Sequence, residues 1–193
     1  MNSYKSSLKT FFELVSSLEK LPSIGKKSAQ KMAYTLCVEN RFLALNIAHA
    51  IENAALLVQR CQKCFGLSEG EICDICSNAQ RDIGVLCIVA KAQDVLTIEE
   101  IGEFGGRYFV LNGEREEIDF ELLNQRIHAE HIKEVIFALS PSLANETMML
   151  YIEDKIEANV VFSKIAQGVP TGIGLDSIDQ LSLSRAISAR VRT

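Results

Sequence analysis

Four of the six cysteines lie close together in the chain, with the spacing Cys-x2-Cys-x8-Cys-x2-Cys, at Cys61, Cys64, Cys73 and Cys76. Each Cys-x-x-Cys turn can direct two sulfurs towards one point, and the intervening loop returns the chain to complete a tetrahedron. Four thiolates leave no coordination position open, so the pattern predicts one structural zinc ion per chain. The alternatives are disulfides, which a reducing cytosol disfavours, and free core cysteines, for which this stretch has little apolar cover.

The other two cysteines, Cys37 and Cys87, stand in apolar helical and strand contexts, which favours small buried hydrophobic residues over metal ligands. The cysteine-rich stretch has almost no hydrophobic residues of its own to order it. We therefore expect zinc binding, on the order of 10–16 kcal/mol in small zinc peptides, to act as folding energy here.

A second candidate site is the segment 21–31, which reads Leu-Pro-Ser-Ile-Gly-Lys-Lys-Ser-Ala-Gln-Lys and joins two helical stretches. Gly25 is expected to adopt a backbone angle that other residues resist. The helix after it begins with free amide groups and a positive dipole end, which suit a phosphate, and Lys26, Lys27 and Lys31 surround that point. The pattern predicts a helix-hairpin-helix that binds backbone phosphate and reads no bases. The alternative is a plain helical hairpin with lysines on a solvated face, but three lysines without an acid favour DNA.

The elements that must position these residues follow from hydrophobic periodicity. Apolar residues recur at helical spacing over residues 8–18, 26–38 and 43–58. From residue 85 onward, short β-rich runs at 85–89, 108–111, 134–139 and 160–162 alternate with helical stretches from 93 and over 120–130 and 143–157. This alternation predicts a parallel sheet with right-handed crossovers, followed by a short helix around residues 182–190.

The overall composition is that of a folded globular protein, with 48% hydrophobic and 23% charged residues. The net charge of −5 argues against a surface coated by nucleic acid and confines any DNA contact to a local basic patch. The chain shows no apolar run of membrane-spanning length and no secretory signal, so we expect a cytoplasmic protein.

The chain resembles a known family, the bacterial recombination mediator RecR, over essentially its whole length. The similarity lies in the hairpin at residues 21–34, the Cys-Asp-Ile-Cys-Ser-Asn stretch at 73–78, the Gly-Gly-Arg-Tyr-Phe-Val-Leu stretch at 105–111 and the Gly-Val-Pro-Thr-Gly stretch at 168–172.

The resemblance implies an α+β fold in four parts. These are a helix-hairpin-helix DNA-binding domain (1–55), a C4 zinc finger (56–80), a Toprim-like parallel α/β domain (81–163) and a C-terminal Walker-B-like assembly tail (164–193). It also implies a tetrameric ring that binds single- and double-stranded DNA without catalysis. In recombinational DNA repair, such a scaffold acts with RecO, and in some lineages RecF, to help load RecA on single-stranded DNA.

The chain departs from the family pattern at three places. Ser23 replaces a usual hairpin glycine, Ala90-Lys91 replaces a glutamate at the end of the first strand of the sheet, and the segment 140–146 keeps Glu146 as its one acid. The departure at Ser23 predicts a slightly reshaped turn.

Two other functions compete with the scaffold. Catalytic Toprim domains nick DNA with clustered acids that hold magnesium, and here only Asp94, Glu99 and Glu146 stand near the expected edge of the sheet. Helix capping and solvated surface are the favoured roles for these three acids. The other alternative is a zinc-dependent protein-interaction module without DNA binding, against which the lysine cluster argues.

Overall fold

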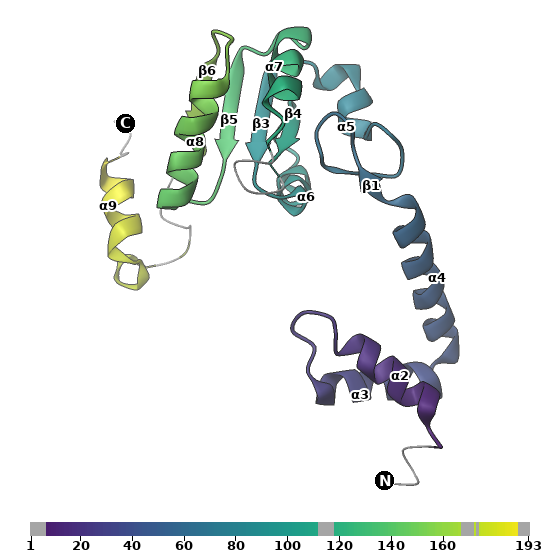
Figure 1. Ribbon diagram of the computed structural model, residues 1–193. Coiled ribbons are helices and arrows are strands. Elements are labelled where there is room, and N and C mark those ends of the chain that lie inside the picture. The colour runs from purple at the N-terminus through teal and green to yellow at the C-terminus, as the bar shows by residue number, and fades with distance from the viewer. Residues whose placement is uncertain (1–6, 112–117, 167–171, 173, 189–193) are drawn as a thin grey trace. The chain divides into compact units, whose positions relative to one another are not determined.

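The computed structural model describes residues 7–111, 118–166, 172 and 174–188 (Figure 1). The chain divides into two compact units, Met1–Val58 and Gln59–Thr193, each with its own core. Among the described residues, no helix is both long and apolar enough to cross a membrane. Part of the predicted tail, residues 167–171, 173 and 189–193, lies outside the described residues.

The first unit is helical, with α2 (Lys9–Leu18), α3 (Lys26–Tyr34), a π-helical turn (Thr35–Glu39) and α4 (Arg41–Leu57). Its core is small: Val15 of α2 packs against Ala29 and Ala33 of α3, and both alanines are fully buried. Alanine at these two positions lets the helices approach closely, because no larger side chain separates their backbones.

Helix α4 carries apolar side chains that nothing in the described part of the first unit covers. None of its residues is buried, and Phe42, Leu45 and Leu56 are 75%, 69% and 77% exposed. The helical spacing of apolar residues over 26–38 also predicts that Met32 of α3 points inward, yet its side chain is 43% exposed. That prediction is wrong for the single chain, because the first unit offers too few apolar partners to bury this face.

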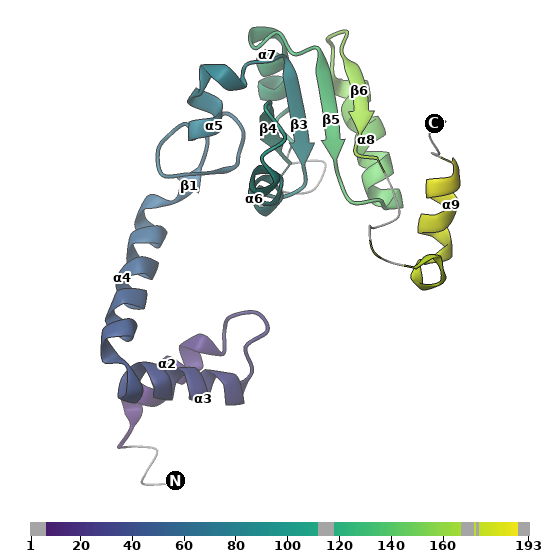
Figure 2. The same cartoon turned by 180° about the vertical axis from the view of Figure 1, so that it is seen from behind.

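The second unit contains a four-stranded parallel sheet in the order β4-β3-β5-β6, visible from both sides in Figures 1 and 2. Its strands are β3 (Val85–Val89), β4 (Arg107–Val110), β5 (Glu134–Ala138) and β6 (Val161–Lys164). The connecting helices are α6 (Ala92–Ile101), α7 (Phe120–Ala129) and α8 (Leu143–Lys155). The predicted alternation of strands and helices is confirmed.

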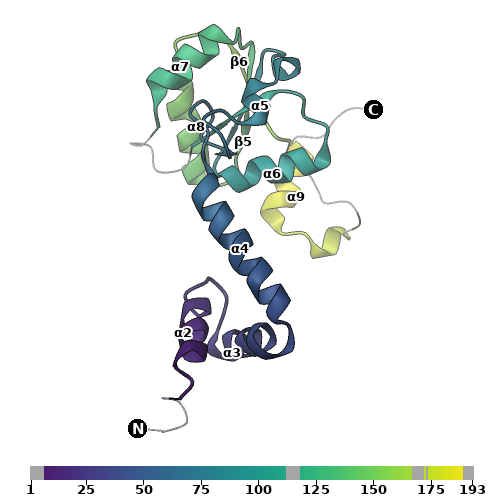
Figure 3. The ribbon, with the colours of Figure 1, turned by 90° about the vertical axis from the view of Figure 1, so that its right-hand side faces the viewer.

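Helices cover both faces of the sheet, α7 and α8 on one face and α6 on the other (Figure 3). Strand β3 shows why: Leu86 and Ile88 contribute to the core beneath α7 and α8, whereas Cys87 and Val89 contribute to the core beneath α6. Successive strand residues point to opposite faces, so a strand covered on both sides reads as a continuous apolar run.

Shorter elements precede and follow the sheet. They are the antiparallel pair β1 (Gln59–Arg60) and β2 (Leu67–Ser68), the helices α5 (Asp74–Ser77) and η2 (Ala79–Arg81), and, near the C-terminus, η4 (Leu175–Ser177) and α9 (Gln180–Ser188). At the entry to β4, Gly106 has no room for a side chain, because a Cβ there would lie 2.6 Å from the Val85 carbonyl oxygen.

Candidate zinc site and DNA-binding hairpin

The four predicted cysteines come together. Their sulfurs all lie within 4.8 Å of one another, and the Cys64 and Cys73 sulfurs are 3.6 Å apart. All four side chains are buried. Within the part of the chain that the structure describes, this is the one group of three or more His, Cys, Asp or Glu side chains placed to hold a metal ion.

Local backbone structure directs the sulfurs inward. Cys61 follows β1, and the turn after it closes with the Phe65 amide donating to the Cys61 carbonyl at 2.9 Å. Phe65 has a left-handed backbone (φ 59°), which lets the chain reverse directly after Cys64. Backbone amides also donate to the sulfurs, Gly66 to Cys64 at 3.4 Å and Cys73 to Cys61 at 3.3 Å.

The electrostatics of the cluster favour a bound cation. The hydrogen bond between Cys73 and Cys64, followed by those to Cys76, lowers the pKa of Cys73 and raises the pKa of Cys64. Four buried sulfurs within 4.8 Å of one another cannot all be charged without a cation, because neighbouring thiolates repel one another in a buried site. A divalent ion removes this repulsion, so the donor set fits one structural zinc ion per chain.

Cys87 does not belong to the site. It is 3% exposed in the core beneath α6, and burial raises the pKa of its thiol to about 12. Its prediction as a buried hydrophobic residue is confirmed. Cys37, in the π-helical turn, is only partly buried.

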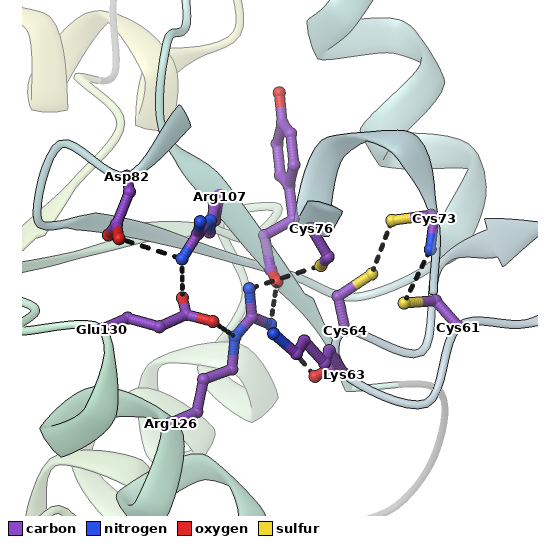
Figure 4. Close-up of polar contacts among 10 residues, drawn as sticks. Cys61, Lys63, Cys64, Cys73, Cys76, Asp82, Arg107, Arg126 and Glu130 are labelled. Carbon is purple, nitrogen blue, oxygen red and sulfur yellow. Dashed lines mark hydrogen bonds and ion pairs between the residues drawn. The ribbon is translucent and has the colours of Figure 1, made fainter. Parts of the chain in front are cut away.

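A buried arginine that sequence reasoning missed lies against the zinc site (Figure 4). Arg126 of α7 donates from Nη2 to the Cys76 sulfur at 3.5 Å and from Nε to Glu130 at 3.0 Å. Glu130 also forms an ion pair with Arg107 at 3.1 Å. In the sequence, Arg126 and Glu130 look like an ordinary ion pair four residues apart on a helix. The other partners of Arg126 come from distant parts of the chain, so nothing in the sequence marks its contact with the zinc site.

The hairpin between α2 and α3 differs from its prediction at Gly25, because the left-handed residue of the turn is Ser23. The Ile24 amide donates to the Leu21 carbonyl at 3.3 Å, which closes a turn with Pro22 and Ser23 at its centre. Ser23 has φ 65°, the angle that a type II turn requires at this position and that glycine adopts most easily.

Gly25, in contrast, is extended (φ −87°, ψ 168°), with open space where a Cβ would lie. The prediction that Gly25 needs an angle other residues resist is therefore wrong. The left-handed angle falls two residues earlier, on Ser23, because a type II turn requires a positive φ at position i+2.

The predicted lysines lie on α3 as expected from their spacing. Lys26, Lys27 and Lys31 are all exposed, and the first turn of α3 contains no acidic residue. Among the described residues, no side chain caps the helix at Gly25. The amides at this end are thus available to an anion, and the positive end of the helix dipole favours one.

The three acids considered for magnesium do not gather. Asp94 caps α6 by accepting from the Lys91 amide at 2.8 Å, which confirms its capping role. Glu99 is 33% exposed, so its predicted place on the surface holds only in part; it also pairs with Arg81 and accepts from the Tyr108 hydroxyl at 2.6 Å. Glu146 lines a separate cavity of about 390 Å³ between α8 and β6.

Comparison with known families divides the chain into three recognisable segments. Residues 11–55 match the family "RecR, helix-hairpin-helix", and residues 84–166 match the family "Toprim domain". Residues 58–78 match the four-cysteine zinc finger domain of RecR. The segment that holds the four clustered cysteines is thus similar to a zinc-binding domain.

Full-length relatives are similar throughout. "Recombination protein RecR" from Helicobacter pylori (strain Shi470) is 53% identical over 193 residues, all of both chains. Proteins of the same name from a Nitratiruptor species and from Campylobacter jejuni are 49% and 45% identical, over 97% and 96% of this chain and 99% and 97% of theirs.

Proposed function

Because the chain belongs to the RecR family of recombination proteins, we propose that it is a non-catalytic DNA-binding scaffold of recombinational repair. Its partners in this role are RecO, and in some lineages RecF, with which it helps to load RecA on single-stranded DNA. The chain is 53% identical over its full length to a recombination protein and carries a helix-hairpin-helix, a four-cysteine zinc finger and a Toprim domain.

The observation that carries the proposal is the open end of α3. Gly25, Lys26, Lys27 and Lys31 form its DNA contact: Gly25 brings no side chain between the helix end and a phosphate, and the three exposed lysines supply positive charge. Contacts of this kind neutralise phosphates and carry no sequence information, which suits a protein that acts anywhere in a genome.

The scattered acids support a scaffold over a nicking enzyme. A magnesium-dependent Toprim reaction needs carboxylates that converge on the metal. In this chain Asp94 is used as a helix cap, and Glu99 is bound to Arg81 and Tyr108. Asp94 and Glu99 thus already have protein partners, and within the described residues the three acids are not among the groups placed to hold a metal ion.

The uncovered apolar face of α4 supports assembly into a ring. A cavity of about 670 Å³ in the first unit is lined mainly by apolar side chains, including Leu21, Met32, Ile47 and Ile51. Exposed apolar surface of this extent marks an interface, and the proposed occupant is a second copy of the chain. A ring also brings several small basic patches to one DNA molecule, which multiplies affinity in an acidic protein.

The DNA contact is tested with the double substitution Lys27→Ala and Lys31→Ala. We expect the slope of log affinity against log salt for duplex DNA to fall by about two for each subunit in contact, measured by fluorescence anisotropy. Zinc content should not change, because both lysines are exposed and far in sequence from the four zinc ligands. Lys31 also lines the cavity proposed to receive a second copy, so assembly is measured in parallel by light scattering.

The matched control is Lys133→Ala with Lys155→Ala, which removes the same charge from the second unit. It should leave the slope within experimental error of the parent. If the two double variants bind DNA equally well at low salt, the hairpin does not hold DNA, and a zinc-dependent protein-interaction module becomes the better description.

A further inference from the structure

Arg126 is a buried cation in direct contact with the zinc site. Its side chain is 4% exposed, although arginine is almost never buried without several partners. The guanidinium has four of them: the Glu130 carboxylate, the Cys76 sulfur at 3.5 Å, the Tyr108 carbonyl at 2.7 Å and the Lys63 carbonyl at 3.0 Å. Figure 4 shows these contacts converging on one planar group.

These partners belong to different parts of the second unit. Lys63 lies between Cys61 and Cys64 in the first cysteine turn, Cys76 lies on α5 in the second turn, and Tyr108 lies in β4 of the sheet. Arg126 itself comes from α7, 50 positions after Cys76 in the chain. A single side chain therefore joins both halves of the zinc finger to the sheet.

The contacts of Arg126 require a closed zinc finger. Four thiolates around one divalent ion keep a net negative charge, which a buried guanidinium stabilises. The ion also holds the two cysteine turns together, and Arg126 contacts one group on each turn, the Lys63 carbonyl and the Cys76 sulfur. Without zinc the two turns separate, and Arg126 loses both contacts. Arg126 then shares one carboxylate, Glu130, with Arg107, which approaches it at 3.1 Å.

We propose that Arg126 is a positioning residue that couples zinc occupancy of the finger to the packing of α7 on the sheet. In the zinc-bound chain it orients the Cys76 thiolate and compensates the charge of the site. When zinc leaves and the two cysteine turns separate, the guanidinium loses two of its four partners, and α7 loosens from the sheet. The zinc finger and the Toprim domain thus fold as one unit, although each has its own motif.

The competing explanation is that Arg126 is an ordinary buried arginine whose loss weakens the whole unit. Arg107 separates the two explanations. It is also buried (7% exposed) and also paired with Glu130, but its ion-pair partners are Asp82 and Glu130, and within the described chain it forms no hydrogen bond to a cysteine. Removing either arginine leaves Glu130 with the other one.

The test compares Arg126→Met with Arg107→Met in the full chain. Zinc affinity is measured by competition with a chromophoric chelator, at a temperature where both variants remain folded. We expect Arg126→Met to weaken zinc binding about 10- to 100-fold, the usual effect of removing a partner of a metal ligand. Arg107→Met should change it less than about threefold, since it contacts no zinc ligand. Equal effects, or none at Arg126, would overturn the proposal.

A spectroscopic readout separates orientation of the thiolate from stability. With cobalt in place of zinc, the sulfur-to-cobalt charge-transfer band should move to lower energy in Arg126→Met, because the sulfur loses a hydrogen-bond donor. The band should not move in Arg107→Met. Arg126→Lys keeps the charge but cannot reach all four partners, so we expect zinc affinity between those of the parent and Arg126→Met.

A measurement on the unaltered chain covers the case in which Arg126→Met does not fold. Hydrogen exchange is followed with zinc bound and after chelation. We expect peptides of α7, including the Glu130 amide that donates to the Arg126 carbonyl at 2.9 Å, to exchange faster without zinc. Peptides of α8 and β6 should change little. If exchange of α7 is the same in both states, no coupling exists.

Discussion

Ser23 gives the most direct test of the hairpin geometry. Its backbone angle (φ 65°) lies in the left-handed region, which costs a residue with a Cβ about 1–2 kcal/mol. Replacing Ser23 by glycine removes this cost. The substitution also gives the unfolded chain more conformational freedom, which offsets about 0.5–1 kcal/mol. The expected net effect is a stabilisation of about 0.5–1 kcal/mol.

The expected shift in melting temperature follows from the size of the first unit, Met1–Val58. For a domain of this length, a change of about 1 kcal/mol moves the midpoint by about 4–8 °C, so Ser23→Gly should raise it by roughly 2–8 °C. Calorimetry and circular dichroism at the helical band both measure this transition.

Two controls isolate the backbone angle as the cause. Ser28→Gly makes the same chemical change inside α3, where glycine is a poor helix former, and should lower stability by about 0.5 kcal/mol. Ser23→Ala removes the hydroxyl but keeps the Cβ, so it should not stabilise. If Ser23→Gly lowers the midpoint as Ser28→Gly does, the turn does not hold Ser23 in the left-handed region and the reasoning fails.

Two further predictions concern the cysteines and the assembly. In the zinc-bound chain, iodoacetamide should label Cys37 first, because it is only partly buried. After zinc is removed by a chelator, the reagent should also label the four ligands Cys61, Cys64, Cys73 and Cys76. Cys87 should react only when the chain unfolds, since burial raises the pKa of its thiol to about 12. Mass spectrometry counts the adducts, and labelling of Cys87 in the folded chain would contradict its burial. Phe42→Glu with Leu45→Glu should lower the mass measured by light scattering at micromolar concentration, because both side chains are exposed on α4 in the single chain. Leu96→Glu on α6, 52% exposed, is the control, and an unchanged mass in the α4 variant would exclude this face as the contact between copies.

Local sequence patterns predicted the zinc ligands, the buried strand and the exposed lysines. The spacing of Cys61, Cys64, Cys73 and Cys76 predicted a site that the structure assembles within 4.8 Å, because a Cys-x-x-Cys turn fixes the separation of its own two sulfurs. The apolar run 85–89 predicted a strand covered on both faces, since alternate residues must both meet a core. Exposure of Lys26, Lys27 and Lys31 followed equally from helical spacing.

The sequence did not reveal the contacts between residues that lie far apart in the chain. Arg126 bonds to Lys63 and Cys76, which lie 63 and 50 positions away, so its role exists only once α7 has packed on the sheet. Nothing in the sequence showed that Glu99 is hydrogen-bonded, because Tyr108 reaches it only from β4 of the folded sheet. The zinc ligands are set by a turn of a few residues, whereas the residue that ties them to the fold is set by strand order and helix packing, which no local pattern encodes.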